Sequence, residues 1–199
     1  ETIQEFLSNF KIENIYSFEA SPKTFKNLQI KLNLIKKKFS ETNIEIFNFG
    51  IGNTNSKNIF YELPDSNSST FNIIDRNSSY YKRKNKILSF FLSKSESIIQ
   101  ETTVSQIKLG EFISNNNIAY IDILKIDTEG YELEVLKGLE QEISMIKFIY
   151  FEHHYDNMIK KNYKYSDIND YLKIKGFHKV FKIKMPLRKS FDYIYKKTI

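Results

Sequence analysis

The stretch YIDILKIDTEGYELEVLKGL, residues Tyr120–Leu139, decides the fold class of this chain. Its first part, Tyr120–Asp127, is apolar and has the length of a buried strand. From Glu129 to Ile143 leucine side chains recur at three-residue spacing, which predicts a helix with one apolar face. A strand that passes into a helix over so short a joint is the building unit of an α/β protein.

The same alternation continues on both sides of this stretch. Strands are predicted at 12–19, 44–49, 58–63, 102–107, 120–127, 146–152, 177–184 and 191–196. Ser21-Pro22 opens a helix between the first two strands, because a serine hydroxyl caps free amides and proline suits the first helical position. No helix separates the last two strands, so they predict an antiparallel edge. We therefore expect an α/β fold: a mostly parallel sheet with an antiparallel C-terminal edge and helices on both faces.

The 199 residues are enough for one domain with a substantial core. Residues 64–100, which begin at Pro64 and are rich in Ser and Asn, interrupt the alternation and are interpreted as an irregular insertion or substrate loop. The chain opens at Glu1 inside a helix-like pattern. We therefore expect a single domain over residues 1–199 whose N-terminal end has been removed.

The composition excludes several classes of protein. No cysteine is present, which excludes disulfide frameworks, thiolate zinc sites and thiol nucleophiles. No apolar run approaches the ~20 residues of a membrane-spanning helix. The net charge of +6 comes from dispersed lysines with acidic residues between them, which argues against a nucleic-acid partner. With no visible signal peptide, these features favour a cytoplasmic protein.

Ionisable and glycine residues gather where four predicted strands end, and ligands of open α/β sheets bind beyond the carboxyl ends of the strands. These ends are Glu19, Gly50-Ile51-Gly52, Asp127-Thr128-Glu129-Gly130 and Glu152-His153-His154-Tyr155-Asp156. We expect the functional site at this edge of the sheet.

Glu152 and His154 are two residues apart on a strand and share one face, whereas His153 points to the other. An imidazole titrates near neutrality, so either histidine suits the work of a general base. A histidine beside a carboxylate also suits a divalent metal, which we favour less than a base, and packing against a helix is the structural alternative.

Two further carboxylates have both a functional and a structural interpretation. Glu19 can accept hydrogen bonds from both hydroxyls of a ribose, or favour the N-terminus of the next helix by its charge. Asp127 can face an active site, cap the following helix, or do both. Glu129, Glu132 and Glu134 are interpreted by position as solvated acids of a helix.

Five segments then resemble, in order, the FkbM family of S-adenosylmethionine-dependent methyltransferases. The specific one is LKIDTEGYELEVLKGL (Leu124–Leu139). The others are IYSFEASPKTFKNLQIKLN (Ile15–Asn33), FNFGIGNTNSKNIFY (Phe47–Tyr61), SNSST (Ser66–Thr70) and IYFEHH (Ile149–His154). The family's glycine-rich turn after the first strand has no counterpart before Gly50, so we expect that strand to lie upstream of Glu1.

This resemblance implies a Rossmann-like class I methyltransferase that binds S-adenosylmethionine and methylates a hydroxyl of a sugar, glycan or natural product. It implies three groups of site residues. The cofactor-binding residues are Glu19 and Ala20 at the ribose, Gly50 and Ile51 at the adenine, and Asp127 at the methyl-transfer site. The catalytic residues are His154 as first choice of base, His153 as its alternative, Asp127 and Glu152. The acceptor-binding residues are Ser68, Ser69, Thr70 and Glu129.

Other functions stay open on the sequence alone. Glu19 serves a nicotinamide-dependent oxidoreductase equally well, although such an enzyme needs a G-x-G-x-x-G loop and a Tyr or Lys dyad that we do not find. The rings and cations of Tyr80–Lys84 suit a nucleic-acid-binding module. A catalytically silent remnant used for assembly is the third alternative.

Overall fold

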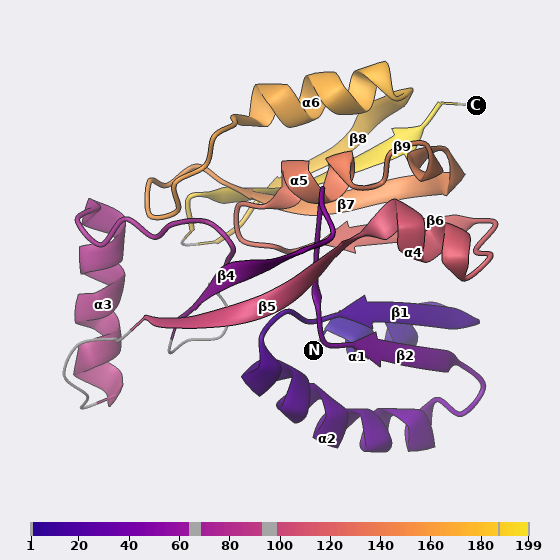
Figure 1. Cartoon of the computed structure of the whole chain (residues 1–199), viewed down its shortest axis with the longest axis horizontal. Helices are drawn as coiled ribbons and strands as arrows, with labels where there is room; N and C mark the ends of the chain where they lie inside the picture. Colours follow the sequence, from indigo (N-terminus) through magenta and orange to yellow (C-terminus); the bar gives the residue numbers. More distant parts are fainter. Residues whose placement is uncertain (1, 64–68, 93–98, 187, 199) are drawn as a thin grey trace. The chain divides into compact units, whose positions relative to one another are not determined.

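The computed structural model describes residues 2–63, 69–92, 99–186 and 188–198 (Figure 1). The chain divides into two compact units, residues 1–50 and residues 51–199. Among the described helices, none combines the length and apolar character that a bilayer crossing requires.

The first unit is the predicted strand–helix–strand unit preceded by a short helix. Its elements are α1 (Thr2–Asn9), β1 (Asn14–Phe18), α2 (Pro22–Lys38) and β2 (Asn43–Phe47). The two strands pair in parallel, with Ile15 opposite Ile44. The Ser21 hydroxyl accepts a hydrogen bond from the Thr24 amide at 3.1 Å, which confirms the predicted cap of α2. Leu7, Leu32, Ile35 and Ile44 form the core of this unit.

The second unit contains two sheets and the remaining helices. Its elements are β3 (Gly50–Gly52, which begins at the last residue of the first unit), β4 (Ser56–Glu62), α3 (Ser79–Leu92), β5 (Gln100–Lys108), α4 (Leu109–Asn115), β6 (Ile121–Ile126), α5 (Glu132–Lys137), the 3-10 helix η2 (Glu142–Met145), β7 (Ile146–His154), α6 (Tyr165–Ile174), β8 (Phe177–Lys184) and β9 (Ser190–Lys197).

The larger sheet of this unit has the strand order β6-β7-β9-β8. β6 and β7 are parallel, and β9 runs antiparallel to both of its neighbours, so the predicted antiparallel pair at the C-terminal edge is confirmed. The centre of the sheet is the core of the unit, where Ile149, Tyr193 and Tyr195 are fully buried. Helix α6 lies along this sheet in Figure 1 and buries Ile168 and Leu172.

The α/β class is confirmed, but hydrogen bonds divide the strands into three sheets where the sequence predicted one. The third sheet has the order β3-β5-β4, and β4 pairs with β5 antiparallel over its whole length. Both edges of β5 are thus occupied, by β3 and by β4, so β5 extends no other sheet.

Two predicted segments also differ from the structure. The helix predicted over 129–143 consists of α5 and η2, because Gly138 ends α5 and Glu140 adopts a left-handed conformation with φ +52°. The insertion 64–100 is not irregular throughout, since it contains α3. That helix begins where the Ser78 hydroxyl accepts a hydrogen bond from the Tyr81 amide at 3.2 Å.

Candidate functional site

The carboxyl ends of β6 and β7 lie side by side in the second unit. Ile126 pairs with Phe151 in the parallel register, so the residues that follow each strand emerge at the same edge. This is the edge at which the sequence predicted a site, and both strands place ionisable side chains there.

Four side chains meet at this edge, and we call them the histidine–carboxylate cluster: His154, Glu129, Glu152 and Asp156. Nε2 of His154 lies 3.3 Å from Oε2 of Glu129 and 3.4 Å from Oε1 of Glu152. Nδ1 of the same ring lies 3.4 Å from Oδ2 of Asp156. Each of the four side chains is about nine-tenths buried or more. Both ring nitrogens therefore face carboxylates inside the protein.

The electrostatics of the cluster favour shared protons. Burial raises the pKa of Glu129 to about 7, and the positive charge of His154 opposes this rise. Burial by itself would lower the pKa of His154, but the hydrogen bond to Asp156 and the charges of Glu129 and Glu152 outweigh it, so that this pKa is raised. Near neutral pH, Glu129 exchanges a proton easily, and the neighbouring carboxylates favour the cationic form of His154.

Three atoms of the cluster are buried and have no hydrogen-bond partner in the part of the chain that the structure describes. They are Oε2 of Glu129, Oε1 of Glu152 and Nε2 of His154. Their mutual distances suit ion pairs, but their angles do not suit hydrogen bonds. An unsatisfied buried polar group costs about 1–3 kcal/mol, so these atoms are arranged for a partner that donates and accepts hydrogen bonds.

Backbone geometry delivers Glu129 to the cluster. Glu129 and Gly130 both have positive φ, +49° and +90°, which turns the chain sharply between β6 and α5. A glutamate in this conformation is strained, and such strain concentrates at functional sites. The side chain of Thr70, which is fully buried, donates a hydrogen bond to the Glu129 carbonyl at 2.8 Å, and Asn72 donates one to the Gly130 carbonyl.

The serine-rich loop was predicted to contact the acceptor. In its described part, the side-chain hydroxyls form hydrogen bonds within the protein. The hydroxyl of Ser69 accepts a hydrogen bond from the Leu63 amide at 3.2 Å. The hydroxyl of Thr70 is used to hold Glu129, as described above. Ser68 lies outside the described residues.

His153 faces away from the cluster, as the alternation of strand residues predicted. It is buried against the ring of Tyr155, with a centroid distance of 4.9 Å. Burial and the charge of Lys161 lower the pKa of His153 to about 3, so the ring is neutral at physiological pH. It packs as a core residue of this face.

Glu132 is not the solvated helix acid that its position suggested. Its side chain is buried and accepts hydrogen bonds from the Gly130 amide at 2.7 Å and from the Tyr163 hydroxyl at 2.5 Å. Burial raises the pKa of Glu132. The sign of this in the sequence was Gly130, two residues before Glu132. Because α5 begins at Glu132, its carboxylate folds back onto the tight turn at Gly130 instead of facing water.

Asp127 lies at the end of β6 but is not in the cluster. Its side chain is half exposed and pairs with Lys125 at 2.6 Å. The carboxylates that lie within 3.4 Å of the imidazole of His154 are those of Glu129, Glu152 and Asp156. Of these three, the sequence analysis paired only Glu152 with this histidine.

The remaining predicted cofactor residues are Glu19, Ala20 and Gly50 of the first unit and Ile51, the first residue of the second. Glu19 follows β1, and its Oε1 accepts a hydrogen bond from the Ser21 amide at 2.8 Å. Asn48 donates hydrogen bonds to the carbonyl groups of Glu19 and Ala20 at 2.9 and 3.4 Å. Gly50 and Ile51 lie in β3, where both are buried.

Sequence reasoning missed other residues around the cluster. Lys161 donates a hydrogen bond to the His154 carbonyl, and Arg188 lies 3.9 Å from Glu152. Burial raises the pKa of Tyr80, at the start of α3, and the charges of Asp156, Glu129 and Glu152 add to this rise. Lys161 and Arg188 come from loops whose position depends on tertiary contacts, so no local pattern predicts them. Asp156 could have been found from the sequence, because it lies two residues after His154 among the ionisable residues at the end of the strand.

Among the described ranges, no group of three or more His, Asp or Glu side chains is arranged to hold a metal ion. Both ring nitrogens of His154 lie 3.3–3.4 Å from carboxylate oxygens.

Comparison with known proteins gave one match. The family model described as Methyltransferase FkbM domain matches residues 3–179. Searches of the curated proteins and of the solved structures gave no significant match. The matched range includes all four residues of the histidine–carboxylate cluster and extends over most of both units.

Proposed function

This chain belongs to the methyltransferase FkbM domain family, and from that membership we propose that it transfers a methyl group from S-adenosylmethionine to a hydroxyl oxygen of a sugar, glycan or natural product. The observation that carries the hydroxyl acceptor is the set of three unpartnered buried atoms in the histidine–carboxylate cluster. A hydroxyl group can donate a hydrogen bond to a carboxylate and accept one from an imidazolium at the same time.

The residues of the first unit fit the proposed cofactor. Glu19 stands at the carboxyl end of a parallel strand, and the Ser21 amide fixes the orientation of its carboxylate. Such a carboxylate suits the two hydroxyls of a ribose. When bound, S-adenosylmethionine supplies an electrophilic methyl group on a sulfonium. Gly50 beside the adenine and Ala20 beside the ribose complete the part of the proposed site that the first unit supplies, in a Rossmann-like class I fold. The roles of Ile51 beside the adenine and of Asp127 towards the reacting groups, both residues of the second unit, stay predictions.

Glu129 is the proposed proton acceptor. Its pKa of about 7 lets it take a proton from the acceptor hydroxyl at neutral pH, whereas an ordinary glutamate is a weaker base. The imidazolium of His154 then stabilises the negative charge that develops on the acceptor oxygen. From the sequence, His154 was predicted to be the base. The raised pKa values of Glu129 and His154 favour Glu129 as the base and His154 as the group that stabilises the developing charge.

Glu152 and Asp156 act as positioning residues in this proposal. Asp156 fixes the imidazole through Nδ1, while Glu152 contributes the second unpartnered carboxylate oxygen. A positioned base contributes about 10²–10⁴-fold to the rate. His153 suits the role less, because it faces the other side of the strand and its pKa of about 3 makes it a weak base. A cytoplasmic location stays a prediction.

Calorimetry with S-adenosylmethionine tests the proposal. Replacing Glu19→Gln removes the carboxylate charge and should weaken binding by about 10-fold or more, since hydrogen bonds to charged groups contribute about 1.5–3 kcal/mol. Glu13→Gln, an exposed glutamate in the same unit, is the matched control and should bind like the wild type. The proposal would be contradicted if the wild-type protein did not bind S-adenosylmethionine, or if Glu19→Gln and Glu13→Gln bound it with equal affinity.

The proposed transfer to a hydroxyl oxygen, with Glu129 as the base, is tested by measuring methyl transfer to a panel of sugars, polyols and phenols. Glu129→Gln should lower kcat by about 10²-fold or more and leave the affinity for S-adenosylmethionine unchanged. Transfer at the wild-type rate by this variant would place the base elsewhere.

A further inference from the structure

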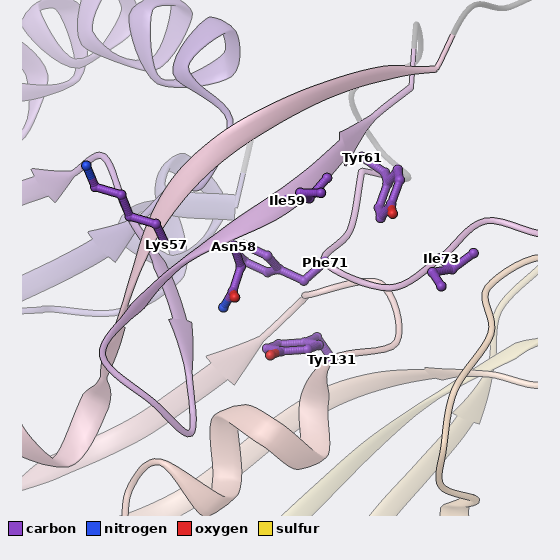
Figure 2. Close-up of a pocket in the computed structure, with 7 residues that line it drawn as sticks. All are labelled: Lys57, Asn58, Ile59, Tyr61, Phe71, Ile73 and Tyr131. Atoms are coloured by element: carbon purple, nitrogen blue, oxygen red, sulfur yellow. The ribbon is translucent and has the colours of Figure 1, made fainter.

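A second cavity, about 400 Å³ in volume, opens beside the turn that carries Glu129. Figure 2 shows its walls: Ile59 and Tyr61 project from β4, Phe71 and Ile73 come from the segment that precedes α3, and Tyr131 stands just before α5. All of these residues belong to the second unit. The cavity is lined by three aromatic rings, two isoleucines, an amide and one lysine.

The walls of this pocket are fixed by contacts on every side. Phe71 packs against Phe60 and Tyr131, with ring centroids 4.9 and 5.2 Å away. The backbones of Tyr61 and Thr70 exchange two hydrogen bonds, at 2.8 and 3.1 Å. Because the side chain of Asn72 also holds the Gly130 carbonyl, the aromatic walls are preformed rather than dependent on a ligand.

The pocket exposes apolar surface that folding leaves uncovered. Ile59 and Ile73 are 50% and 57% exposed, and they lie on two different segments that line the same cavity. Single exposed apolar residues are common on protein surfaces, but a group of them inside a cavity indicates a binding surface.

Lys57 gives the pocket a charge. It is exposed on β4 and lines the cavity, and within the described ranges no acidic side chain pairs with it. Figure 2 shows the ammonium of Lys57 at one end of the cavity, pointing away from Phe71 and Tyr131, so the charge lies at the rim of the apolar surface. A ligand that matches both features has an apolar ring body and an anionic group such as a carboxylate, sulfonate or phosphate.

We propose that this pocket binds the body of the methyl acceptor, and that the acceptor is an anionic molecule with a flat apolar ring. The proposal rests on the function proposed above. Glu129 and Tyr131 are two residues apart on one rigid turn, so the same turn holds the reacting hydroxyl and contacts the ring of the acceptor. Specificity then resides in Ile59, Ile73 and Lys57, away from the proton transfer.

The fluorescent anion 8-anilinonaphthalene-1-sulfonate is the probe, because it combines aromatic rings with one negative charge. Ile59→Ser should weaken its binding by about fivefold to tenfold, as expected from loss of apolar contact area. Ile183→Ser is the matched control, since Ile183 is 49% exposed on β8 outside the pocket and should leave the affinity unchanged. Equal affinities of the two variants would overturn the proposal.

Lys57 has its own readout in the salt dependence of binding. The wild-type protein should bind the probe more weakly as ionic strength rises, and Lys57→Gln should remove most of this dependence. Lys184→Gln, on an exposed lysine of β8, should keep it. Unchanged salt dependence in Lys57→Gln would overturn the anionic part of the proposal.

Calorimetry with S-adenosylmethionine on the same variants separates this proposal from the proposed function. Ile59→Ser and Lys57→Gln should bind S-adenosylmethionine like the wild type, and a loss of that affinity in both would assign the pocket to the cofactor and overturn the acceptor site. A wild-type protein that fails to bind S-adenosylmethionine overturns the proposed function instead, while the probe results still decide whether the pocket binds a ligand.

Discussion

Glu129→Gln should stabilise the protein at alkaline pH, although it removes a proposed catalytic group. The pKa of Glu129 is about 7 instead of its ordinary 4.5. Between these two values the unfolded chain has lost the proton of Glu129 while the folded protein keeps it. The free energy of unfolding therefore falls as pH rises through this window, and a glutamine, which has no proton to lose, escapes the fall.

The magnitude follows from the two pKa values. The penalty is about 1 kcal/mol at pH 5 and about 3 kcal/mol at pH 8, so the gain of the variant should grow by about 2 kcal/mol across this range. Loss of one carboxylate partner of His154 reduces the gain, which leaves about 1–2 kcal/mol.

Urea unfolding followed by far-UV circular dichroism measures this gain. With a slope of about 2 kcal/mol per molar urea, the midpoint of the variant should exceed that of the wild type by about 0.5–1 M more at pH 8 than at pH 5. Glu101→Gln, an exposed glutamate on β5, is the control and should show no such trend. A difference between Glu129→Gln and wild type that is constant from pH 5 to pH 8 would refute the reasoning.

Two further predictions concern stability and use the same urea assay. Gly138→Ala places a Cβ against the Gly52 carbonyl oxygen and should lower the free energy of unfolding by about 3 kcal/mol or more. Gly176→Ala meets nothing closer than 3.6 Å and should lower it by about 1 kcal/mol, because the backbone there is left-handed. Equal losses in the two variants would contradict the close approach of Gly138 to Gly52. Ser21→Ala removes the cap of α2 and should cost about 1 kcal/mol, against almost nothing for the exposed Ser40→Ala, and a cost no larger than that of Ser40→Ala would show that the cap contributes little.

Local patterns in the sequence were sufficient for most of the elements. Ser21-Pro22 marks the start of α2 because capping depends on neighbouring residues only. The strand Ile146–His154 is apolar over its length, and its period of two correctly separated Glu152 and His154 from His153. The family was likewise predicted from short motifs, and the family match confirms it.

Features that depend on tertiary contacts escaped the sequence analysis. Glu132 looks like a surface acid until Tyr163, 31 residues later, covers it. Helix α3 lies in the Ser- and Asn-rich insertion, and its Tyr81 is buried in a core cluster with residues as distant in sequence as Met158. Helix α5 ends at Gly138, which lies against the backbone of Gly52. Because these two glycines are far apart in sequence, no local pattern predicts this contact.

The strip Thr70–Asp75 defines where this protein tolerates redesign. Its first half is bonded to the Glu129–Gly130 turn, and its second half pairs with Met158–Lys160 through a bridge between Ile74 and Ile159. The strip thus works as a fixed frame, and α3 follows it in the chain. A graft from a homologue that keeps this frame, and a side chain of the size of Tyr81 to fill the hydrophobic core around Ile74 and Met158, should replace α3 without moving the Glu129–Gly130 turn.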